Sequence, residues 1–196
     1  MTSLRILLAE DDSAVAASVH EQLRALGHQV VGEAATGKEA VGLAAKLKPD
    51  LVLMDIVMPD GDGIAAARQI AEQSPTPVVF LSGHFDEELL QGVVASGGLA
   101  YLLKPATSDQ LQAAVGLAQG RFREMKDLGE QVRRLEEVLE ARKLVTRAKG
   151  LIMQRHGLTE EDAHRRMQKE ASQANMKLVD LARAILAADP FVGNGS

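Results

Sequence analysis

Residues 51–63, LVLMDIVMPDGDG, decide the fold of this chain. The apolar run 51–54 has the length of a buried strand, and Asp55 follows it directly. Three further apolar runs also end in polar residues: RILLA (5–9) before Glu10-Asp11-Asp12, VVFL (78–81) before Ser82, and AYLL (100–103) before Lys104-Pro105. In an open α/β sheet, functional groups gather outside the carboxyl ends of the parallel strands. The four stretches therefore predict one site, in which carboxylates, a hydroxyl and a lysine can take up a phosphoryl group.

The first 120 residues alternate short apolar runs with segments of helical spacing. The expected strands are Leu4–Ala9, Val30–Ala34, Leu51–Met54, Val78–Leu81 and Ala100–Leu103. After the first of them, Val15, Val19, Leu23 and Leu26 recur at the spacing of one helix face. The tetrapeptide 36–39, TGKE, has the pattern of a capping box that opens the next helix. Five strand–helix units predict an α/β domain, a doubly wound parallel sheet with helices on both faces.

Composition and charge exclude several classes of protein. The chain has no cysteine, so disulfides and thiolate metal sites are excluded. Its first residues lack the pattern of a signal peptide, and no apolar run reaches the roughly 20 residues that a membrane span requires. We therefore expect a cytoplasmic protein that does not bind membranes. The net charge is −8 over residues 1–120, −1 over 121–141 and +4 over 142–196, which predicts modules with different partners.

A long helix is expected beyond residue 121. Residues 122–144 contain no proline, one glycine and many charges. Met125, Leu128, Val132, Leu135 and Leu139 alternate spacings of three and four, as in a coiled-coil seam, although two heptads are few for one. A second seam is shifted by one residue and consists of Val138, Ala141, Val145, Ala148 and Ile152. The helix is thus expected to begin as a pairing element and to end inside a small bundle.

Stop and start signals divide the rest of the chain. His156-Gly157 is a typical helix stop, and Thr159 followed by Asp162 is expected to cap a second helix. A third helix carries Leu178, Leu181, Ala182, Ile185 and Leu186 and is expected to end at Asp189-Pro190. The predicted organisation is a domain over residues 1–120, a coiled-coil helix over 121–141 and a three-helix bundle over 142–196.

Four motifs occur in one order at characteristic spacing: LLAEDD (7–12), LMDIVMPDGDG (53–63), VVFLSG (78–83) and AYLLKP (100–105). Over about residues 4–120 they make the chain resemble the receiver domains of two-component response regulators. The resemblance implies a flavodoxin-like fold, a sensor histidine kinase as partner and Asp55 as the phosphoacceptor. It implies no enzyme, because a receiver catalyses only its own phosphorylation and dephosphorylation.

The resemblance also implies a Mg²⁺ site. Asp11 and Asp55 would bind the metal directly, Glu10 would act nearby or through water, and the Val57 carbonyl would supply a backbone ligand. Mg²⁺ prefers oxygen ligands and keeps several waters, so a few carboxylates suit it. Phosphoryl transfer asks the protein mainly for positioning and charge neutralisation. For Asp12, two roles stay open, a cap of the following helix and a metal ligand.

The remaining receiver residues would respond to the phosphoryl group. Lys104 would pair with the acceptor and then with the phosphoryl oxygens, and Ser82 would hydrogen-bond the same group. Tyr101 would turn inward as a switch residue, although a half-buried aromatic of an edge strand has the same pattern. The bond before Pro105 is expected to be cis, a form nearly confined to X-Pro bonds. His84 is either an exposed loop residue or an influence on phosphoryl lifetime.

Two residues depart from the receiver pattern, and one rival is excluded. Glu10 stands where many receivers have Asp, and Ala106 stands where a phenylalanine is common, which leaves phosphoryl lifetime open. A phosphatase of the haloacid dehalogenase type also uses an aspartate nucleophile after a strand. Such enzymes need a second carboxylate two residues on, and Val57 occupies that position.

Residues 135–188 resemble the ANTAR domain, the RNA-binding module of bacterial transcription antitermination regulators. The residues that carry the resemblance are Arg147-Ala148-Lys149-Gly150, Met153, Arg155-His156-Gly157-Leu158, Glu161, Ala163, Lys177-Leu178, Ala182 and Leu186. His164 departs from a position that is often aromatic. The resemblance implies RNA hairpins in nascent transcripts as partners, and a homodimer on activation. The candidate RNA-binding residues are Lys143, Arg147, Lys149, Arg155, His156, Arg165, Arg166 and Lys169.

The charges of this module are less specific than its motifs. Lys143, Arg147, Lys149 and Arg155 are expected on one side of the first helix, where lysines and arginines bind phosphates through counterion release. Two other outputs stay open, a DNA-binding transcription factor and a protein-interaction regulator. A DNA-reading helix would carry base-contacting side chains near its start. The third helix begins instead with mostly apolar residues, MKLVD (176–180), which argues against a DNA-binding output, and the family resemblance favours RNA.

Overall fold

The computed structural model describes residues 3–59, 61–83 and 87–188, with the side chains of all but 61–62 and 87–90. The chain forms two compact units, Met1–Lys126 and Asp127–Ser196, and each is described by itself. In the described ranges no helix is both long and apolar enough to cross a membrane.

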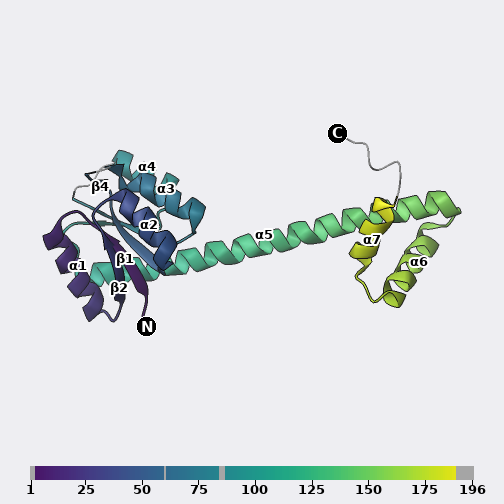
Figure 1. Cartoon of the computed structure of the whole chain (residues 1–196), viewed down its shortest axis with the longest axis horizontal. Coiled ribbons are helices and arrows are strands. Elements are labelled where there is room, and N and C mark those ends of the chain that lie inside the picture. The colour runs from purple at the N-terminus through teal and green to yellow at the C-terminus, as the bar shows by residue number, and fades with distance from the viewer. Residues whose placement is uncertain (1–2, 60, 84–86, 189–196) are drawn as a thin grey trace. The chain divides into compact units, whose positions relative to one another are not determined.

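The first unit contains a parallel sheet of five strands (Figure 1). These are β1 (Arg5–Ala9), β2 (Gln29–Ala34), β3 (Leu51–Asp55), β6 (Val78–Ser82) and β7 (Ala100–Leu103). Their order across the sheet is β2-β1-β3-β6-β7, and every pair is parallel. Each predicted strand agrees with an observed one to within a residue at either end. The predicted doubly wound α/β fold is therefore confirmed.

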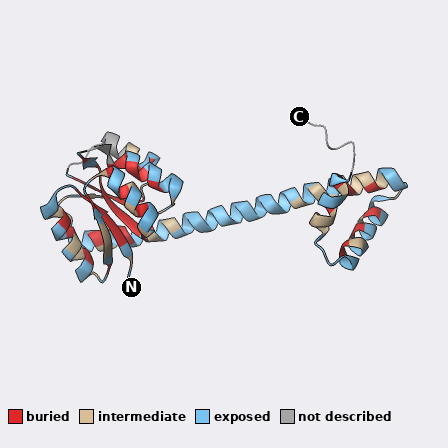
Figure 2. Ribbon diagram, in the orientation of Figure 1, coloured by how far each residue is buried: buried red, intermediate tan, exposed pale blue. Residues whose placement is uncertain are grey.

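Helices cover both faces of this sheet. On one face α1 (Ser13–Ala25) and the start of α5 (Ser108–His156) pack on the strands, and on the other lie α2 (Gly37–Leu47), α3 (Gly63–Gln73) and the end of α4 (Glu87–Ala95). The central strands β3 and β6 are buried along their whole length (Figure 2), as in parallel sheets covered on both sides. The sequence did not predict the short antiparallel pair β4 (Val57–Met58) and β5 (Gly61–Asp62) that follows β3.

Local side-chain hydrogen bonds begin two of these helices. The Asp12 carboxylate accepts from the backbone N–H groups of Ala14 and Val15, so Asp12 is the N-cap of α1. The Thr36 hydroxyl accepts from the Glu39 N–H at the start of α2, as the sequence pattern predicted. Each cap satisfies N–H groups that have no partner inside the helix.

Helix α5 continues for 49 residues without a break. It runs through Gly120 and Gly129, because a single glycine costs a helix only about 1 kcal/mol relative to alanine. The predicted division of the chain at residues 120 and 141 thus falls within one helix.

The second unit is a small helical bundle. The end of α5 packs against α6 (Glu160–Gln173) and α7 (Leu178–Ala187). Its buried residues are Ala148, Ile152, Ala163, Met167, Ala182 and Leu186. As predicted, α5 ends at His156, before Gly157 with φ +62°, and Thr159 caps α6. The predicted stop at Asp189-Pro190 lies outside the described residues.

Candidate functional site

The carboxyl edge of the sheet brings together residues that are far apart in the sequence. Ala9 pairs with Met54 across β1 and β3, so Glu10 and Asp55 lie level at neighbouring strand ends. On the other side, Asp55 pairs with Leu81 of β6, and Ser82 pairs with Leu103 of β7. Parallel pairing alone therefore brings the four predicted stretches to one edge.

The Lys104 ammonium joins two buried carboxylates at this edge. Its Nζ donates to both Glu10 oxygens, at 2.9 and 2.7 Å, and to Asp55 Oδ2 at 2.7 Å. The side chains of Glu10, Asp55 and Lys104 are 0%, 7% and 17% exposed. Such carboxylates repel one another in a medium of low polarity, and the ammonium offsets this repulsion.

The pKa values of Glu10 and Lys104 are both shifted by this arrangement. Burial raises the pKa of Glu10 above its ordinary value, although the hydrogen bond from Lys104 opposes the rise. Burial by itself would lower the pKa of Lys104, but the hydrogen bonds and charges of Asp55 and Glu10 raise it overall. Lys104 is therefore a cation at neutral pH, and its positive charge stabilises the charged carboxylates of both Glu10 and Asp55.

Three carboxylates at this edge could hold a divalent metal. Glu10, Asp11 and Asp55 each offer one oxygen, and these oxygens lie within 4.8 Å of one another. Hard divalent cations prefer such all-oxygen sets, so the residues present fit a metal ion. Asp12 lies apart, since its side chain caps α1. Of its two open roles, the structure supports the cap.

The backbone around Asp55 is held by short-range contacts. Asp55 Oδ1 accepts from the Val57 N–H at 3.2 Å, and the Val57 side chain is exposed beside it. On the far side of the site the bond between Lys104 and Pro105 is cis, as predicted. The Lys104 N–H donates to the Ser82 carbonyl at 2.7 Å, which joins the ends of β6 and β7.

Gly63 is the last residue of the motif LMDIVMPDGDG, and the backbone beside it leaves room only for a glycine. Its N–H donates to the Ile56 carbonyl, and an added Cβ would lie 2.0 Å from the Asp55 carbonyl oxygen. We expect Gly63→Ala to lower the free energy of unfolding by about 3 kcal/mol, because a backbone atom has to move. Urea denaturation measures this change.

Gly42→Ala is the matched control for that substitution. Gly42 lies inside α2, where an added Cβ meets no atom within 4 Å, and we expect a gain of about 0.5–1 kcal/mol. If Gly63→Ala and wild type have the same free energy of unfolding, the backbone at Asp55 can move to accept the added Cβ without loss of stability, and the prediction is wrong.

The two predicted switch residues occupy different environments. Ser82 is 1% exposed at the end of β6. Tyr101 is half-buried on β7, opposite Phe80, and packs against the core below α3 and α4. The inward turn of Tyr101 stays a prediction, because it concerns the phosphorylated state. His84 lies outside the described residues.

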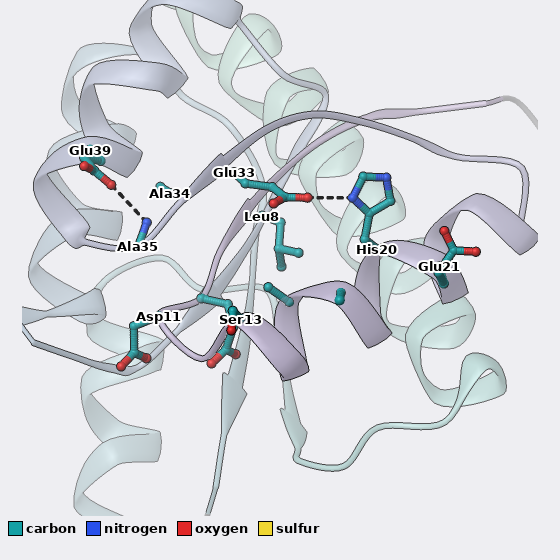
Figure 3. Close-up of a pocket in the computed structure, with 12 residues that line it drawn as sticks. Leu8, Asp11, Ser13, His20, Glu21, Glu33, Ala34, Ala35 and Glu39 are labelled. Carbon is teal, nitrogen blue, oxygen red and sulfur yellow. Dashed lines mark hydrogen bonds and ion pairs between the residues drawn. The ribbon is translucent and has the colours of Figure 1, made fainter.

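Two cavities adjoin the acidic edge. One, of about 520 Å³, lies between α1, β2 and the start of α2 and is lined by Glu10, Asp11 and other polar residues. Figure 3 shows His20 of α1 and Glu33 of β2 pointing toward one another there, with Nδ1 and Oε1 2.6 Å apart. Sequence reasoning missed this pair, since no local pattern relates a helix residue to a strand residue 13 positions on.

The second cavity is an apolar groove of about 440 Å³ beside Lys104. It lies between α1 and the residues after β7, and its lining includes Val15, Val19, Pro105 and Ala106. Ala106 is the residue that departs from the receiver pattern, and a larger side chain there would fill part of the groove. The groove therefore opens directly next to the Lys104–Asp55 pair.

The basic residues of the second unit do not form one face, which corrects the prediction for α5. An α-helix turns about 100° per residue, so Arg147 and Lys149 point to opposite sides. Lys143 and Arg147 are exposed one turn apart, and Lys143 pairs with Glu140. Lys149 is only 17% exposed and pairs with Glu160. Arg155 and His156 are exposed at the end of the helix.

Helix α6 carries a second set of cations. Arg165 and Lys169 are exposed one turn apart on the side away from Ala163 and Met167, which face the core. Arg165 pairs with Glu161, and Arg166 pairs with Glu170. Arg147 and Lys169 differ from these residues, because neither forms an ion pair within the described ranges.

Comparison with known protein families identifies both units. Residues 6–116 match the response regulator receiver domain, and residues 133–186 match the ANTAR domain. The transcriptional regulatory protein PdtaR of Mycobacterium tuberculosis is 43% identical over 182 residues, which are 93% of this chain and 89% of that protein. LiaR of Bacillus subtilis, also a transcriptional regulatory protein, is 36% identical over 117 residues, 59% of this chain and 56% of its own length.

Solved structures show the same fold in the first unit. The signal receiver domain of a modulated diguanylate cyclase from Desulfovibrio desulfuricans G20 matches with a TM-score of 0.59 and 30% identity. It covers 63% of this chain and 99% of that chain. The receiver domain of a NarL response regulator from Mycobacterium tuberculosis matches with a TM-score of 0.57 and 28% identity, over 61% and 99% of the two chains.

Proposed function

The chain belongs to the response regulators that carry a receiver domain followed by an ANTAR domain, and from this premise we propose that phosphorylation of Asp55 controls its binding to RNA. The family is not enzymatic, and its output is RNA binding with transcription antitermination. The observation that carries the proposal is the Lys104 bridge between Glu10 and Asp55 at the carboxyl edge of the sheet. This bridge holds the buried Asp55 carboxylate beside the Lys104 ammonium, which can pair with the negative charge of an incoming phosphoryl group.

Mg²⁺ is the proposed metal. Glu10, Asp11, Asp55 and the Val57 carbonyl would hold it, and it would neutralise charge on the phosphoryl oxygens. The remaining work falls to the protein. Asp55 attacks phosphorus, the bond from phosphorus to the histidine nitrogen of the donor breaks, and a carboxyl–phosphate bond forms. The released histidine leaves with the electron pair of that bond.

Three further residues would respond to the new group. Lys104 leaves its carboxylate partners to pair with a phosphoryl oxygen, and the Ser82 hydroxyl donates to another. Tyr101 then turns inward behind Ser82. The close link between the ends of β6 and β7 supports this order, because Lys104 donates its N–H to the Ser82 carbonyl. A change at Ser82 is thereby passed to the strand that carries Tyr101.

The proposed phosphodonor is a sensor histidine kinase, which receivers require as a partner. The apolar groove beside Lys104 supports an approach from the α1 side, since a partner seated there lies next to Asp55. The kinase then brings its phosphohistidine to the acidic edge.

The proposed RNA surface combines exposed cations of α5 and α6. Arg147 and Lys169 lie away from the bundle core and are not engaged by acidic side chains within the described ranges. Lys143, Arg155, His156, Arg165 and Arg166 add charge around them. Such residues bind the phosphates of RNA hairpins in a nascent transcript, and the bound hairpin prevents a terminator from forming. A protein that reads nascent transcripts acts in the cytoplasm, which is the proposed location.

A homodimer is the proposed active form. Met125, Leu128, Val132, Leu135 and Leu139 follow a coiled-coil seam and are 54–64% exposed in the single chain. A second copy paired along this seam would bury them. Phosphorylation needs to shift the equilibrium between paired and unpaired forms by only a few kcal/mol. A shift of about 2 kcal/mol already changes the ratio of the two forms by a factor of about 30.

The test compares RNA affinity in the two states of the full chain. Fluorescence anisotropy would measure binding to a synthetic RNA with two linked hairpins and to a duplex DNA of equal length. We expect beryllofluoride with Mg²⁺ to tighten RNA binding at least about tenfold, the equivalent of 1.4 kcal/mol, and to leave DNA binding weak. Sedimentation would follow the mass of the protein in the same samples. Equal and weak binding to both nucleic acids in both states would overturn the proposal.

A further inference from the structure

One lysine of the RNA-binding module differs from the other cations in burial. The Lys149 side chain is 17% exposed, and its Nζ lies 2.5 Å from Glu160 Oε1. Its partner Glu160 is 71% exposed, so only the lysine side of this pair is buried, whereas both members of the Lys143 and Arg165 ion pairs are exposed, where such pairs contribute little. The exposed Glu160 carboxylate therefore pairs with an ammonium whose side chain lies largely within the bundle.

The pair joins two helices across their connection. Lys149 follows the buried Ala148 on α5, and Glu160 is the first residue of α6, after the cap Thr159. Between them lies the turn at Gly157, where the chain reverses. Glu160 also sits at a helix N-terminus, which favours a negative charge, and the hydrogen bond from Lys149 lowers its pKa. The link therefore holds the first turn of α6 against α5.

The exposed cations lie on the two helices that this link joins. Arg147 lies on α5, on the side opposite to Lys149, and Arg165 and Lys169 lie on α6. A hairpin that contacts both helices needs the phosphate-binding groups of α5 and α6 at a set distance. Without the link, the start of α6 is held by apolar contacts, among them those of Leu158 and Ala163.

We propose that Lys149 is a positioning residue for RNA binding, which holds α6 through Glu160 and does not itself contact phosphate. This inference rests on the proposed RNA-binding function. It separates Lys149 from the other predicted RNA-binding residues of the chain.

Two neighbouring substitutions distinguish positioning from contact. Glu160→Gln and Glu161→Gln each remove one negative charge from the first turn of α6. If Lys149 contacted phosphate, Glu160→Gln would release it and tighten RNA binding. We expect the opposite, a loss of roughly threefold to tenfold in affinity for the two-hairpin RNA. Glu161→Gln removes the closer of the two carboxylates that pair with the exposed Arg165 and is expected to leave affinity unchanged or to tighten it.

The salt dependence and a conservative substitution give two further readouts. Lys149→Gln should weaken binding but keep the slope of log affinity against log salt, whereas loss of a phosphate contact lowers that slope by about 0.7–0.9. Lys149→Arg should keep the affinity of wild type, because an arginine can rebuild the link. Circular dichroism of every variant would verify that α6 and the other helices remain.

The outcomes separate this inference from the function on which it rests. All measurements use the full chain with beryllofluoride and Mg²⁺. Absence of RNA binding by wild type overturns both. Binding by wild type together with tighter binding by Glu160→Gln or a lower salt slope for Lys149→Gln overturns the positioning role alone.

Discussion

The Asp55→Asn variant is expected to take up no phosphoryl group from acetyl phosphate with Mg²⁺, whereas wild type is phosphorylated on one residue. The Asn amide has the shape of the carboxylate but is not a nucleophile, so the carboxyl–phosphate bond cannot form. The substitution keeps an oxygen that can accept the Val57 N–H, as Asp55 Oδ1 does. Intact-mass spectrometry under rapid quenching measures the result.

Asp12→Asn is the matched control for this experiment. Asp12 is a neighbouring acid, but its carboxylate caps α1 and lies outside the metal cluster. Asn is nearly as good an N-cap as Asp, so stability and phosphorylation should both persist. Phosphorylation of Asp55→Asn at the wild-type rate would place the acceptor on another residue and refute the proposed site.

Lys104→Met is expected to lower the free energy of unfolding by about 3 kcal/mol at pH 7 in metal-free buffer, because it leaves two buried carboxylates without their cation. Met retains the apolar part of the lysine stem, so most of the loss is electrostatic. Mg²⁺ should restore part of the stability, since a metal that binds only the folded state stabilises it. Urea denaturation with and without Mg²⁺ measures both effects.

The same variant should regain stability as the pH falls. Burial already raises the pKa of Glu10 above its ordinary value of 4.5, and loss of the Lys104 hydrogen bond raises it further. Between that value and neutral pH, Glu10 of the folded variant therefore keeps a proton that the same residue has already lost in the unfolded chain. Its stability is therefore lowest at neutral pH and rises toward pH 4.5, as linkage requires.

Lys46→Met serves as the control for Lys104→Met. Lys46 is an exposed lysine in the last turn of α2, and its loss should change stability by no more than about 0.5 kcal/mol. If Lys104→Met is as stable as wild type at pH 7 without metal, then Glu10 and Asp55 do not depend on the ammonium. The proposed electrostatic role of Lys104 would then be wrong.

Local signals were sufficient for the helices and the five strands of the parallel sheet, and for the edge where the site lies. Thr36 and Thr159 cap helices as their positions predict, and Asp12 takes the cap, one of the two roles left open for it, because a cap depends on residues within one turn. Each strand of the five-stranded sheet was recognisable from a short apolar run, and the central strands β3 and β6 are apolar because both of their faces are buried. Once the strands are parallel, polar residues that follow them have to meet at one edge.

The tertiary structure alone decided which of these residues touch. The bond from Lys104 to both Glu10 and Asp55 depends on strand order and register, which join residues 94 and 49 positions apart. Gly63 is required only because its helix begins against the Asp55 carbonyl. The pattern of charges placed Lys149 among the RNA-binding residues, and packing turned it toward Glu160. Periodicity and caps are properties of neighbouring residues, whereas these contacts arise from packing between segments that the sequence keeps apart.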